Sequence, residues 1–285
     1  MLEVVFIGES ATYFYFQDYV ESIVTASKEM GLLCSVEVWT SSTSSFTKLQ
    51  PDKIYIFIQR LPSSILSTCT FQDYPHLAVL NTEQLTRPGW NHVMKQVHDR
   101  GITVLDYSIE NVLLSGLSRH YFVPFQDFKD GPSATPKPKV GDACMVWADG
   151  FLNRWSVFSQ IPNATNILGF GKKRDDSLFQ HKILVNVHAT DEYTVHEHMR
   201  TDRCVYQGMI VVTEPSINTD KLPLRPYMVV EERSKIAARV QFILENYDAV
   251  HQQLFGGMDR ATLQQQARDE WYRVYHELQN RITTK

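Results

Sequence analysis

The sequence of 285 residues lacks the short glycine-rich motifs that mark two large classes of enzyme. The turn after its first apolar run reads Gly8-Glu9-Ser10 without a GxGxxG pattern, and no GxxxxGK[ST] occurs anywhere. Such loops let backbone N–H groups approach the phosphates of dinucleotides and of nucleoside triphosphates. Their absence argues against an NAD-dependent oxidoreductase and against a P-loop enzyme.

Cysteine is scarce, and its four positions are scattered. No CxxC pair and no metal-ligand spacing occur, and most of the cysteines stand in or beside apolar runs. This pattern predicts buried free thiols rather than disulfides, and hence a reducing, cytoplasmic compartment. The cysteines are Cys34, Cys69, Cys144 and Cys204.

Long apolar runs and an excess of positive charge are also missing. No stretch approaches the roughly eighteen apolar residues that suggest a transmembrane helix, and the N-terminus has no basic region of a signal peptide. The net charge of −4 and the pI near 6.2 argue against a nucleic-acid partner bound through phosphate neutralisation. Hydrophobic residues make up 43% of the chain, which is typical of a globular protein with packed cores.

Short β-rich runs alternate with helical patterns along the whole chain. This alternation is typical of parallel, doubly wound sheets. We therefore predict an α/β fold of two Rossmann-like domains that face a cleft. The predicted strands are residues 2–8, 33–39, 53–59, 76–81, 102–108 and 120–125, then 143–148, 163–170, 182–188, 209–214 and 227–231.

One segment interrupts the alternation and divides the chain. Residues 127–142 are rich in Pro, Gly and Lys, which is typical of a linker. The predicted domains are residues 1–126 and residues 143–258. Residues 259–285 carry a long amphipathic helix at 260–282, which we expect to pack back onto the N-terminal domain rather than onto a membrane.

Charged residues stand where strands of the second domain are predicted to end. His188 ends one strand and Glu214 ends the next, at the edge where doubly wound sheets bind ligands. A carboxylate there can accept hydrogen bonds from both hydroxyls of a ribose, and His188, Arg200 and Lys182 can offset phosphate charge. Lys182 starts its strand, so a regular sheet would place it on the far side from the cleft.

Two further patterns bear on catalysis and on metal binding. Glu9 follows the first strand, which suits a general base, although the same position would let it complement a helix dipole. In the HEHMR stretch, His196 and His198 are two residues apart, so on a helix they would point to different sides. We therefore predict no metal site there, and expect Glu197 and Arg200, three apart, to share one helix face.

A basic stretch follows the two glycines Gly169 and Gly171. Lys172, Lys173 and Arg174 follow Gly171 ahead of a predicted helix. Such a loop could clamp a diphosphate, and it could equally be a solvated turn.

Several motifs, taken in order, resemble the GT-B glycosyltransferases of bacteria and large viruses. NTEQL (81–85) and LDYSIEN (105–111) match a "YNxEQ … WDYSxxN" pattern, and HKILVNVH (181–188) matches "sKixlNiH". Glu197 with Arg200 and GMIVVTE (208–214) match "ExxR … GxxvvsE". FLNRW (151–155) is similar to an "sxRR" element but has Asn153 where the first Arg is usual, so only Arg154 carries over.

The resemblance implies that residues 1–126 bind the acceptor and residues 143–258 the nucleotide-sugar, and it also implies which residues surround these substrates. Glu9 would be the catalytic base if the reaction inverts the anomeric centre, whereas a retaining reaction needs no separate base. Glu83, Asp106 and Tyr107 would lie near the cleft or brace its loops. The residues expected to bind the donor are Arg154, Lys182, His188, Glu197, Arg200, Thr213 and Glu214.

The resemblance also implies the reaction. A sugar would move from a nucleotide-sugar donor, with UDP-xylose one candidate, to a glycan acceptor. Transferases of this fold generally work without a bound ion, so we expect no metal and no other cofactor, and for a viral protein the host cytoplasm as its location. The alternatives are a non-catalytic sugar- or nucleotide-binding protein of the same fold, and an epimerase or phosphorylase acting on similar ligands.

Overall fold

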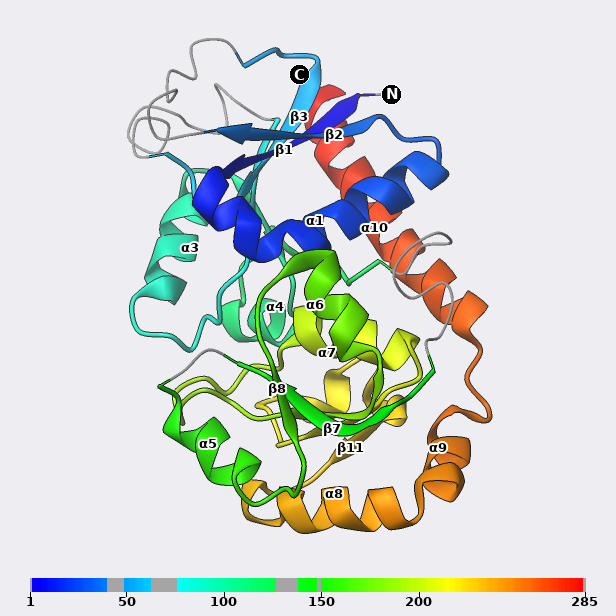
Figure 1. Cartoon of the computed structure of the whole chain (residues 1–285). Helices are drawn as coiled ribbons and strands as arrows, with labels where there is room; N and C mark the ends of the chain where they lie inside the picture. Colours follow the sequence, from blue (N-terminus) through cyan, green and yellow to red (C-terminus); the bar gives the residue numbers. More distant parts are fainter. Residues whose placement is uncertain (1, 40–48, 63–75, 127–137, 148–149, 284–285) are drawn as a thin grey trace. The chain divides into compact units, whose positions relative to one another are not determined.

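The computed structural model describes residues 2–39, 49–62, 76–126, 138–147 and 150–283. The chain divides into two compact units. Unit 1 comprises Met1–Gln126 and Gln264–Lys285, and unit 2 comprises Asp127–Leu263. Each unit is built around one sheet of parallel strands, so the prediction of an α/β fold with two doubly wound sheets is confirmed (Figure 1).

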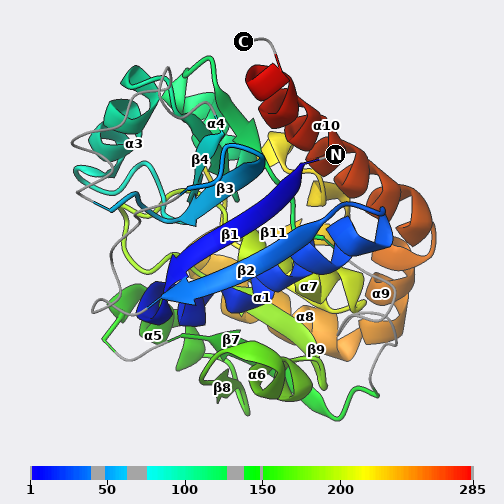
Figure 2. The ribbon, with the colours of Figure 1, turned by 90° about the horizontal axis from the view of Figure 1, so that it is seen from above.

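Unit 1 contains a six-stranded sheet with the order β2-β1-β3-β4-β5-β6. Strand β2 lies on one side of β1, and the strands β3 to β6 lie on the other side. The switch point of the sheet therefore lies between β1 and β3, which run side by side in Figure 2. The strands are β1 (Glu3–Glu9), β2 (Cys34–Trp39), β3 (Lys53–Ile58), β4 (Leu77–Asn81), β5 (Thr103–Asp106) and β6 (His120–Phe122).

Helices of unit 1 alternate with its strands, and a further helix ends the chain. Helix α1 (Ser10–Glu29) follows β1, and α3 (Trp90–Asp99) and α4 (Ile109–Ser115) flank β5. The short α4 was not predicted. It begins at Ser108, whose side chain accepts a hydrogen bond from the backbone of Glu110, and it ends before Gly116 in the left-handed conformation.

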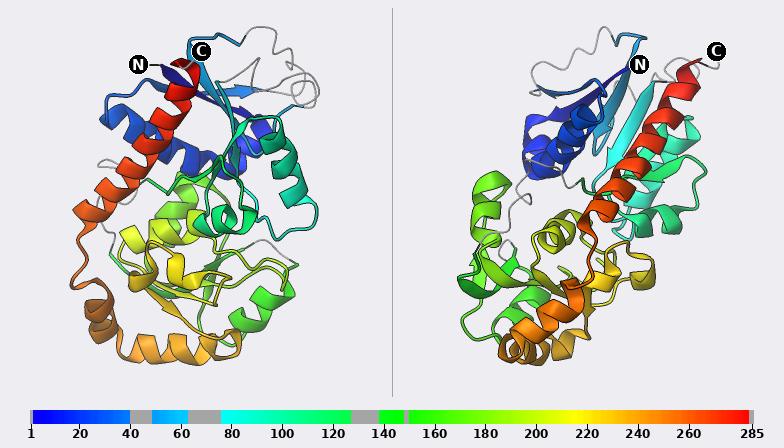
Figure 3. Two further views of the ribbon diagram at one scale, coloured as in Figure 1. Left: turned by 180° about the vertical axis from the view of Figure 1, so that it is seen from behind. Right: turned by 90° about the vertical axis from the view of Figure 1, so that its right-hand side faces the viewer.

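The C-terminal helix α10 (Arg260–Thr283) packs on the elements of unit 1 (Figure 3). Its buried residues recur at helical spacing, which gives the helix one apolar face. Trp271 is fully buried, lies 6.2 Å from Phe6 between ring centroids, and donates a hydrogen bond from Nε1 to Ser27 Oγ at 2.8 Å. The buried residues of this face are Ala267, Trp271, Val274, Tyr275 and Leu278.

Unit 2 contains a five-stranded sheet with the order β11-β10-β9-β7-β8. Its switch point lies between β7 and β9, because β8 stands on one side of β7 and the later strands on the other. The strands are β7 (Gly141–Val146), β8 (Thr165–Ile167), β9 (His181–Asn186), β10 (Ile210–Thr213) and β11 (Met228–Val230).

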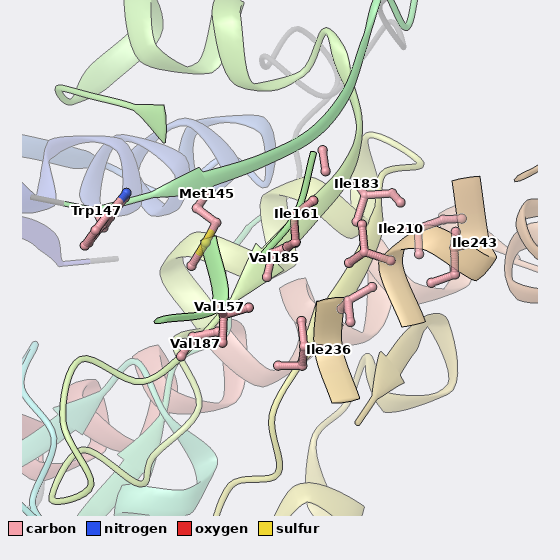
Figure 4. Packing of buried hydrophobic residues seen from close by; sticks show 13 residues of the cluster. Met145, Trp147, Val157, Ile161, Ile183, Val185, Val187, Ile210, Ile236 and Ile243 are labelled. Carbon is pink, nitrogen blue, oxygen red and sulfur yellow. The ribbon is translucent and has the colours of Figure 1, made fainter. Parts of the chain in front are cut away.

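The helices of unit 2 alternate with these strands. They are α5 (Leu152–Phe158), α6 (Gly171–Leu178), α7 (His198–Tyr206), α8 (Ile236–Glu245) and α9 (Tyr247–Phe255), with 3-10 turns η2 (Thr219–Lys221), η3 (Arg225–Tyr227) and η4 (Arg233–Lys235). Figure 4 shows how side chains from β7, β9 and β10 point toward others from α5 and α8 to form the core. Near-continuous apolar strands suit this arrangement, because helices cover both faces of a parallel sheet.

Several expectations can be compared with the structure directly. Cys34, Cys144 and Cys204 are buried free thiols, as predicted, whereas Cys69 lies outside the described residues. Residues 127–137 of the predicted linker also lie outside them. Within the described part of the chain, no helix is both long enough and apolar enough to cross a membrane.

Candidate functional site

Two neighbouring strands of unit 2 end next to the first pair of site residues. His188 stands two residues after β9, and Glu214 directly follows β10. The backbone N–H of His188 donates a hydrogen bond to Glu214 Oε1. The two side chains are 3% and 5% exposed, respectively. The parallel pairing of β9 and β10 therefore brings these two residues together at the carboxyl edge of the sheet.

Arg233 belongs to the same group, although no sequence pattern indicated it. Its Nε donates to Glu214 Oε2 at 2.8 Å, and its Nη1 lies 2.7 Å from Asp191 Oδ1. Asn153 Nδ2 also donates to this Asp191 oxygen, at 2.9 Å. The hydrogen bonds from Arg233 and Asn153 lower the pKa of Asp191. The only signal in the sequence was an arginine close to the start of the helix after the last strand of the sheet.

Two arginines from different helices approach this edge of the sheet. Arg154 on α5 is 5% exposed, and its Nε donates to the backbone carbonyl of Val187 at 2.8 Å. Burial, followed by the positive charge of Arg200, lowers the pKa of Arg154 to about 10, while Glu197 and Glu214 oppose that change. Arg200, Glu197 and Glu214 therefore all lie close enough to Arg154 to influence its pKa.

Arg200 is held by an amide rather than by a close ion pair. Its Nη1 donates to Asn186 Oδ1 at 3.0 Å, whereas Glu197 Oε2 lies 3.9 Å from its Nη2. Asn186 in turn donates from Nδ2 to Thr213 Oγ1 at 3.1 Å. Thr213 is fully buried, and its hydroxyl contacts Asn186, the residue that accepts a hydrogen bond from Arg200.

Lys182 does not join this group. It is the second residue of β9, at the opposite end of the strand from His188. Its Nζ lies 2.9 Å from Asp142 Oδ1 and 5.5 Å from the ring centroid of Tyr247. Lys182 therefore lies at the amino ends of the strands, where a regular sheet was expected to place it, and it pairs with Asp142 there.

In unit 1, Glu9 is the last residue of β1 and stands at the switch point of the sheet. It occupies the N-cap position of α1 but makes no capping hydrogen bond with its side chain. The side chain is exposed. The carboxylate is therefore accessible at the edge where parallel sheets bind ligands.

Asp106, by contrast, is fully buried and surrounded by donors. Oδ1 accepts from the backbone N–H of Ser108 at 2.9 Å and from Asn111 Nδ2 at 3.0 Å. Oδ2 accepts from Asn81 Nδ2 at 2.6 Å and from His120 Nε2 at 2.9 Å. A carboxylate offers about four acceptor positions, so these bonds occupy it and leave no capacity for an acceptor hydroxyl.

Glu83 and Tyr107 lie in the same region of unit 1. Glu83 accepts from Gln59 Nε2 at 3.0 Å and pairs with Arg87 Nη1 at 3.0 Å. Its backbone carbonyl accepts from Asn111 Nδ2 at 2.9 Å. Tyr107 is 2% exposed. These contacts brace the loops after β4 and β5, which was one of the two roles considered for these residues.

The helical position assumed for His196 is wrong. Glu197 is the N-cap of α7, so His198 is the first helical residue and His196 belongs to the preceding loop. The two rings meet edge to face with centroids 5.0 Å apart. Burial, followed by the charges of His198, His188 and Arg200, lowers the pKa of His196 well below its ordinary value. With Asp202 they form a compact group, so the argument against a metal site there does not hold.

The basic stretch after Gly171 is helical rather than a loop. Lys172 pairs with Asp176 one turn later at 3.2 Å, which is a surface contact on α6. Arg174 pairs with the buried Asp175 at 2.7 Å, and Arg203 of α7 reaches the same carboxylate at 2.8 Å. Asp175 therefore joins α6 to α7.

Comparison with solved structures identifies the architecture. T4 phage BGT in complex with UDP and Mn²⁺ superposes with a TM-score of 0.57 at 11% identity over 99% of both chains. An alpha1,3-fucosyltransferase gives a TM-score of 0.53 at 9% identity over 97% of this chain and 90% of that one. The fold is that of the GT-B glycosyltransferases. No family model matches this sequence.

The same comparison corrects one expectation. We expected no metal, because transferases of the GT-B fold generally work without a bound ion. That expectation is wrong, since the T4 phage protein with this fold was solved together with Mn²⁺ as well as UDP.

Sequence relatives come from a large virus, Acanthamoeba polyphaga mimivirus. One uncharacterized protein is 27% identical over 237 residues, which are 79% of this chain and 74% of the relative. A second is 25% identical over 279 residues, which are 93% of this chain but 36% of that relative. The chain therefore spans about a third of the length of this longer protein.

Proposed function

We propose that this protein is a glycosyltransferase that moves a sugar from a nucleoside diphosphate to an acceptor hydroxyl. The observation that carries the proposal is the convergence of Arg154 and Arg200 with Glu214 at the carboxyl edge of the unit 2 sheet. This edge is where doubly wound sheets bind nucleotides. The cationic arginines match the diphosphate of such a ligand, and the anionic Glu214 matches its ribose hydroxyls.

The arginines suit a diphosphate for an electrostatic reason. Arg154 is buried beside the like charge of Arg200, and both effects lower its pKa to about 10. A bound diphosphate would place anionic oxygens between the two guanidinium groups and remove this repulsion. Guanidinium groups also bind phosphate oxygens through two parallel hydrogen bonds, which fixes the orientation of the ligand.

Glu214 suits the ribose. Its carboxylate is oriented by the His188 backbone and by Arg233, each of which bonds one oxygen. Each oxygen retains a second acceptor position, so the pair can still accept from the two ribose hydroxyls. Thr213 and Asn186 would act indirectly, by holding Arg200 at the diphosphate.

The proposed chemistry is stabilisation of the leaving group. As the anomeric C–O bond breaks, negative charge grows on the diphosphate, and fixed cations stabilise it without reorganising. An inverting reaction also needs a base for the acceptor hydroxyl. Glu9 is our candidate for that base, since its carboxylate is exposed at the switch point of the unit 1 sheet.

We further propose a UDP-linked donor and a glycan acceptor. T4 phage BGT, which shares the fold, was solved with UDP. Another solved structure of this fold, with a TM-score of 0.55 at 12% identity over 99% of both chains, is the DNA-modifying enzyme beta-glucosyltransferase. The net charge of −4 favours a glycan over DNA as the acceptor here. UDP-xylose and UDP-glucose are the donors to compare.

The test uses the full chain and separates binding from transfer. Calorimetric titration with UDP and GDP, each with and without Mn²⁺, measures the affinity for the nucleotide. Release of UDP from UDP-xylose and UDP-glucose is then followed alone, with a panel of oligosaccharides, and with duplex DNA. We expect UDP binding, slow UDP release without acceptor, and faster release with one of the oligosaccharides.

Three other outcomes count against parts of this proposal. Absence of nucleotide binding in every condition would overturn it. UDP binding with no release under any condition would favour the non-catalytic binding protein. Acceleration by DNA alone would replace the glycan with a nucleic-acid acceptor.

A further inference from the structure

The loop before α7 and the first two turns of that helix bring two histidines and an aspartate together. One potential ligand atom from each of His196, His198 and Asp202 lies within 4.8 Å of the others. The three residues are 0%, 2% and 4% exposed, respectively. A buried cluster of this composition has the side chains that proteins use to bind zinc.

We propose that His196, His198 and Asp202 bind a divalent transition-metal ion of the zinc class. Two imidazole nitrogens and a carboxylate oxygen suit Zn²⁺, Co²⁺ or Mn²⁺, whereas Ca²⁺ and Mg²⁺ prefer sites made only of oxygen. Zinc is the ion we expect in the cell, because tetrahedral coordination needs only one more ligand, such as a water molecule.

Hydrogen bonds around the cluster already orient the ligands. The Thr201 hydroxyl lies within hydrogen-bond distance of Glu197 O at 3.2 Å and of Asp202 Oδ1 at 3.3 Å. It also lies 2.8 Å from His196 Nε2, a contact whose direction depends on the tautomer of the ring. In the tautomer that donates from Nε2, the ring nitrogen that can bind the ion is Nδ1. Metal-binding histidines are commonly fixed in this way, with the second ring nitrogen donating to an oxygen.

The carboxylate supplies the charge that the ion needs. Asp202 Oδ2 lies 3.1 Å from His198 Nδ1, one helical turn earlier in the chain. Ion binding would require small movements, because ligands of one tetrahedral zinc ion are spaced by about 3.3 Å, given zinc–ligand distances of about 2.0–2.2 Å. Rotation of the His196 side chain can supply these movements, because His196 lies in the loop before α7, whereas His198 and Asp202 are part of the helix.

The position of the cluster assigns a structural role to the ion. Glu197 stands between the two histidines, and Arg200 lies between His198 and Asp202 in the first turns of α7. An ion bound to all three ligands would fix the loop to the helix on both sides of these residues. On the proposed function, it would thereby hold Arg200 in place for the diphosphate without itself contacting the substrate.

The test measures metal binding directly, on untagged full-length protein. After EDTA treatment and removal of the chelator, the chain is incubated with Zn²⁺, passed through a desalting column and analysed for bound metal. We expect about one zinc per chain. Co²⁺ in its place should give the visible absorption of a nitrogen- and oxygen-ligated ion, and Zn²⁺ should abolish it by displacement. Free Zn²⁺ at a hundredfold excess over the Kd should raise the folded-to-unfolded ratio about a hundredfold.

Variants locate the ion. His198→Ala and Asp202→Asn should each lose the bound zinc and the Co²⁺ absorption, while His92→Ala, which changes an exposed histidine of unit 1, should keep both. If a variant does not fold, the wild-type measurements still decide. A wild-type chain that retains no metal and shows no Zn²⁺-dependent stabilisation would overturn the proposal, as would full retention of zinc by folded His198→Ala.

Metal binding and transferase function can fail separately. UDP affinity measured with and without zinc tests only the consequence for Arg200. Zinc binding without UDP binding would leave the metal site intact and remove the proposed function, and the reverse result would remove the metal site alone.

Discussion

The carboxyl edges of the two sheets use their polar side chains in opposite ways. In unit 1, Asp106 is fully buried and its acceptor positions are occupied by donors of the same unit. In unit 2, Arg154 bonds to a backbone carbonyl and Arg200 to an amide oxygen, both of them neutral acceptors. The first arrangement fills the acceptor positions of one charge, whereas the second bonds two positive charges to neutral acceptors, with the Glu197 carboxylate 3.9 Å from Arg200.

This difference teaches that a charged residue at a strand end is not by itself a site residue. What separates the two cases is whether neighbouring groups neutralise the charge and fill its hydrogen-bonding capacity. Glu9 is the exception in unit 1, because its carboxylate is exposed and makes no capping bond. Substitutions test this comparison, because each one is expected to change mainly kcat, the free energy of unfolding or the affinity for UDP.

The largest effect is expected for Glu9→Gln, measured as turnover on the best donor and acceptor. If Glu9 is the base, the amide keeps the shape but cannot accept the proton, so kcat should fall by ~10²–10⁴. UDP affinity and melting temperature should stay near wild type. A normal kcat together with lower stability would instead assign Glu9 to the cap of α1, and would favour a retaining reaction or another base.

Asp106→Ala should cost about 3–5 kcal/mol of unfolding free energy, because it leaves several buried donors without an acceptor. Denaturant unfolding of unit 1, followed by a probe in that unit, measures this loss. Asp99→Ala is the matched control, since that side chain is 61% exposed in the same unit. Equal stability of the two variants would contradict the structural role of Asp106.

Arg154→Met should weaken UDP binding roughly 10- to 100-fold, which corresponds to about 1.5–3 kcal/mol for a charge-assisted hydrogen bond. Stability should change by no more than about 1 kcal/mol, because loss of the bond to Val187 is offset by removal of a buried cation. Calorimetry and thermal unfolding on one preparation measure both quantities. Arg239→Met, which changes an arginine paired with Glu231, should bind UDP normally.

Glu214→Gln should weaken UDP binding about tenfold, since a neutral amide accepts hydrogen bonds from ribose hydroxyls less strongly than a carboxylate. The isosteric change keeps a partner for the His188 backbone, so the fold should survive. Glu231→Gln provides the control in the same unit. Unchanged UDP affinity in a folded Glu214→Gln variant would remove this residue from the ribose site.

The smallest effect is expected for Lys182→Ala. Because its ammonium group pairs with Asp142 at the amino ends of the strands, UDP affinity should change less than about twofold. The same titration as for Arg154→Met measures it. A loss comparable to that of Arg154→Met would mean that position along the strand does not separate site residues from surface residues in unit 2.

Much of the fold could be predicted from local patterns. Apolar runs gave the strands of both sheets, because strands covered on both faces must be apolar throughout. The spacing of Trp271 and its neighbours likewise predicted α10. Among the described residues, two helices were missed: α4 has only 7 residues, and α9 follows α8 after Asn246, where the earlier helix was expected to end.

Part of the candidate site could also be predicted. The order of strands and helices places His188 and Glu214 at the carboxyl edge of one sheet, since strand direction is fixed once the sheet is parallel. Arg233 and Asp191 could not be predicted, because Arg233 bonds to Glu214, 19 positions earlier in the chain, and to Asp191, 42 positions earlier. No periodicity within a single element carries that information.

The sequence by itself determined the parallel sheets, the apolar face of α10 and the strand ends at which charged residues stand, because each depends on short-range periodicity. Only the tertiary structure decided what those charges do. It buried Asp106 among donors, set Arg154 beside Arg200, and began α7 at His198 so that His196, in the preceding loop, meets His198 and Asp202. The physical reason is that charge, solvation and hydrogen bonding depend on groups brought together from distant parts of the chain, and these set the pKa and bonding capacity of each side chain.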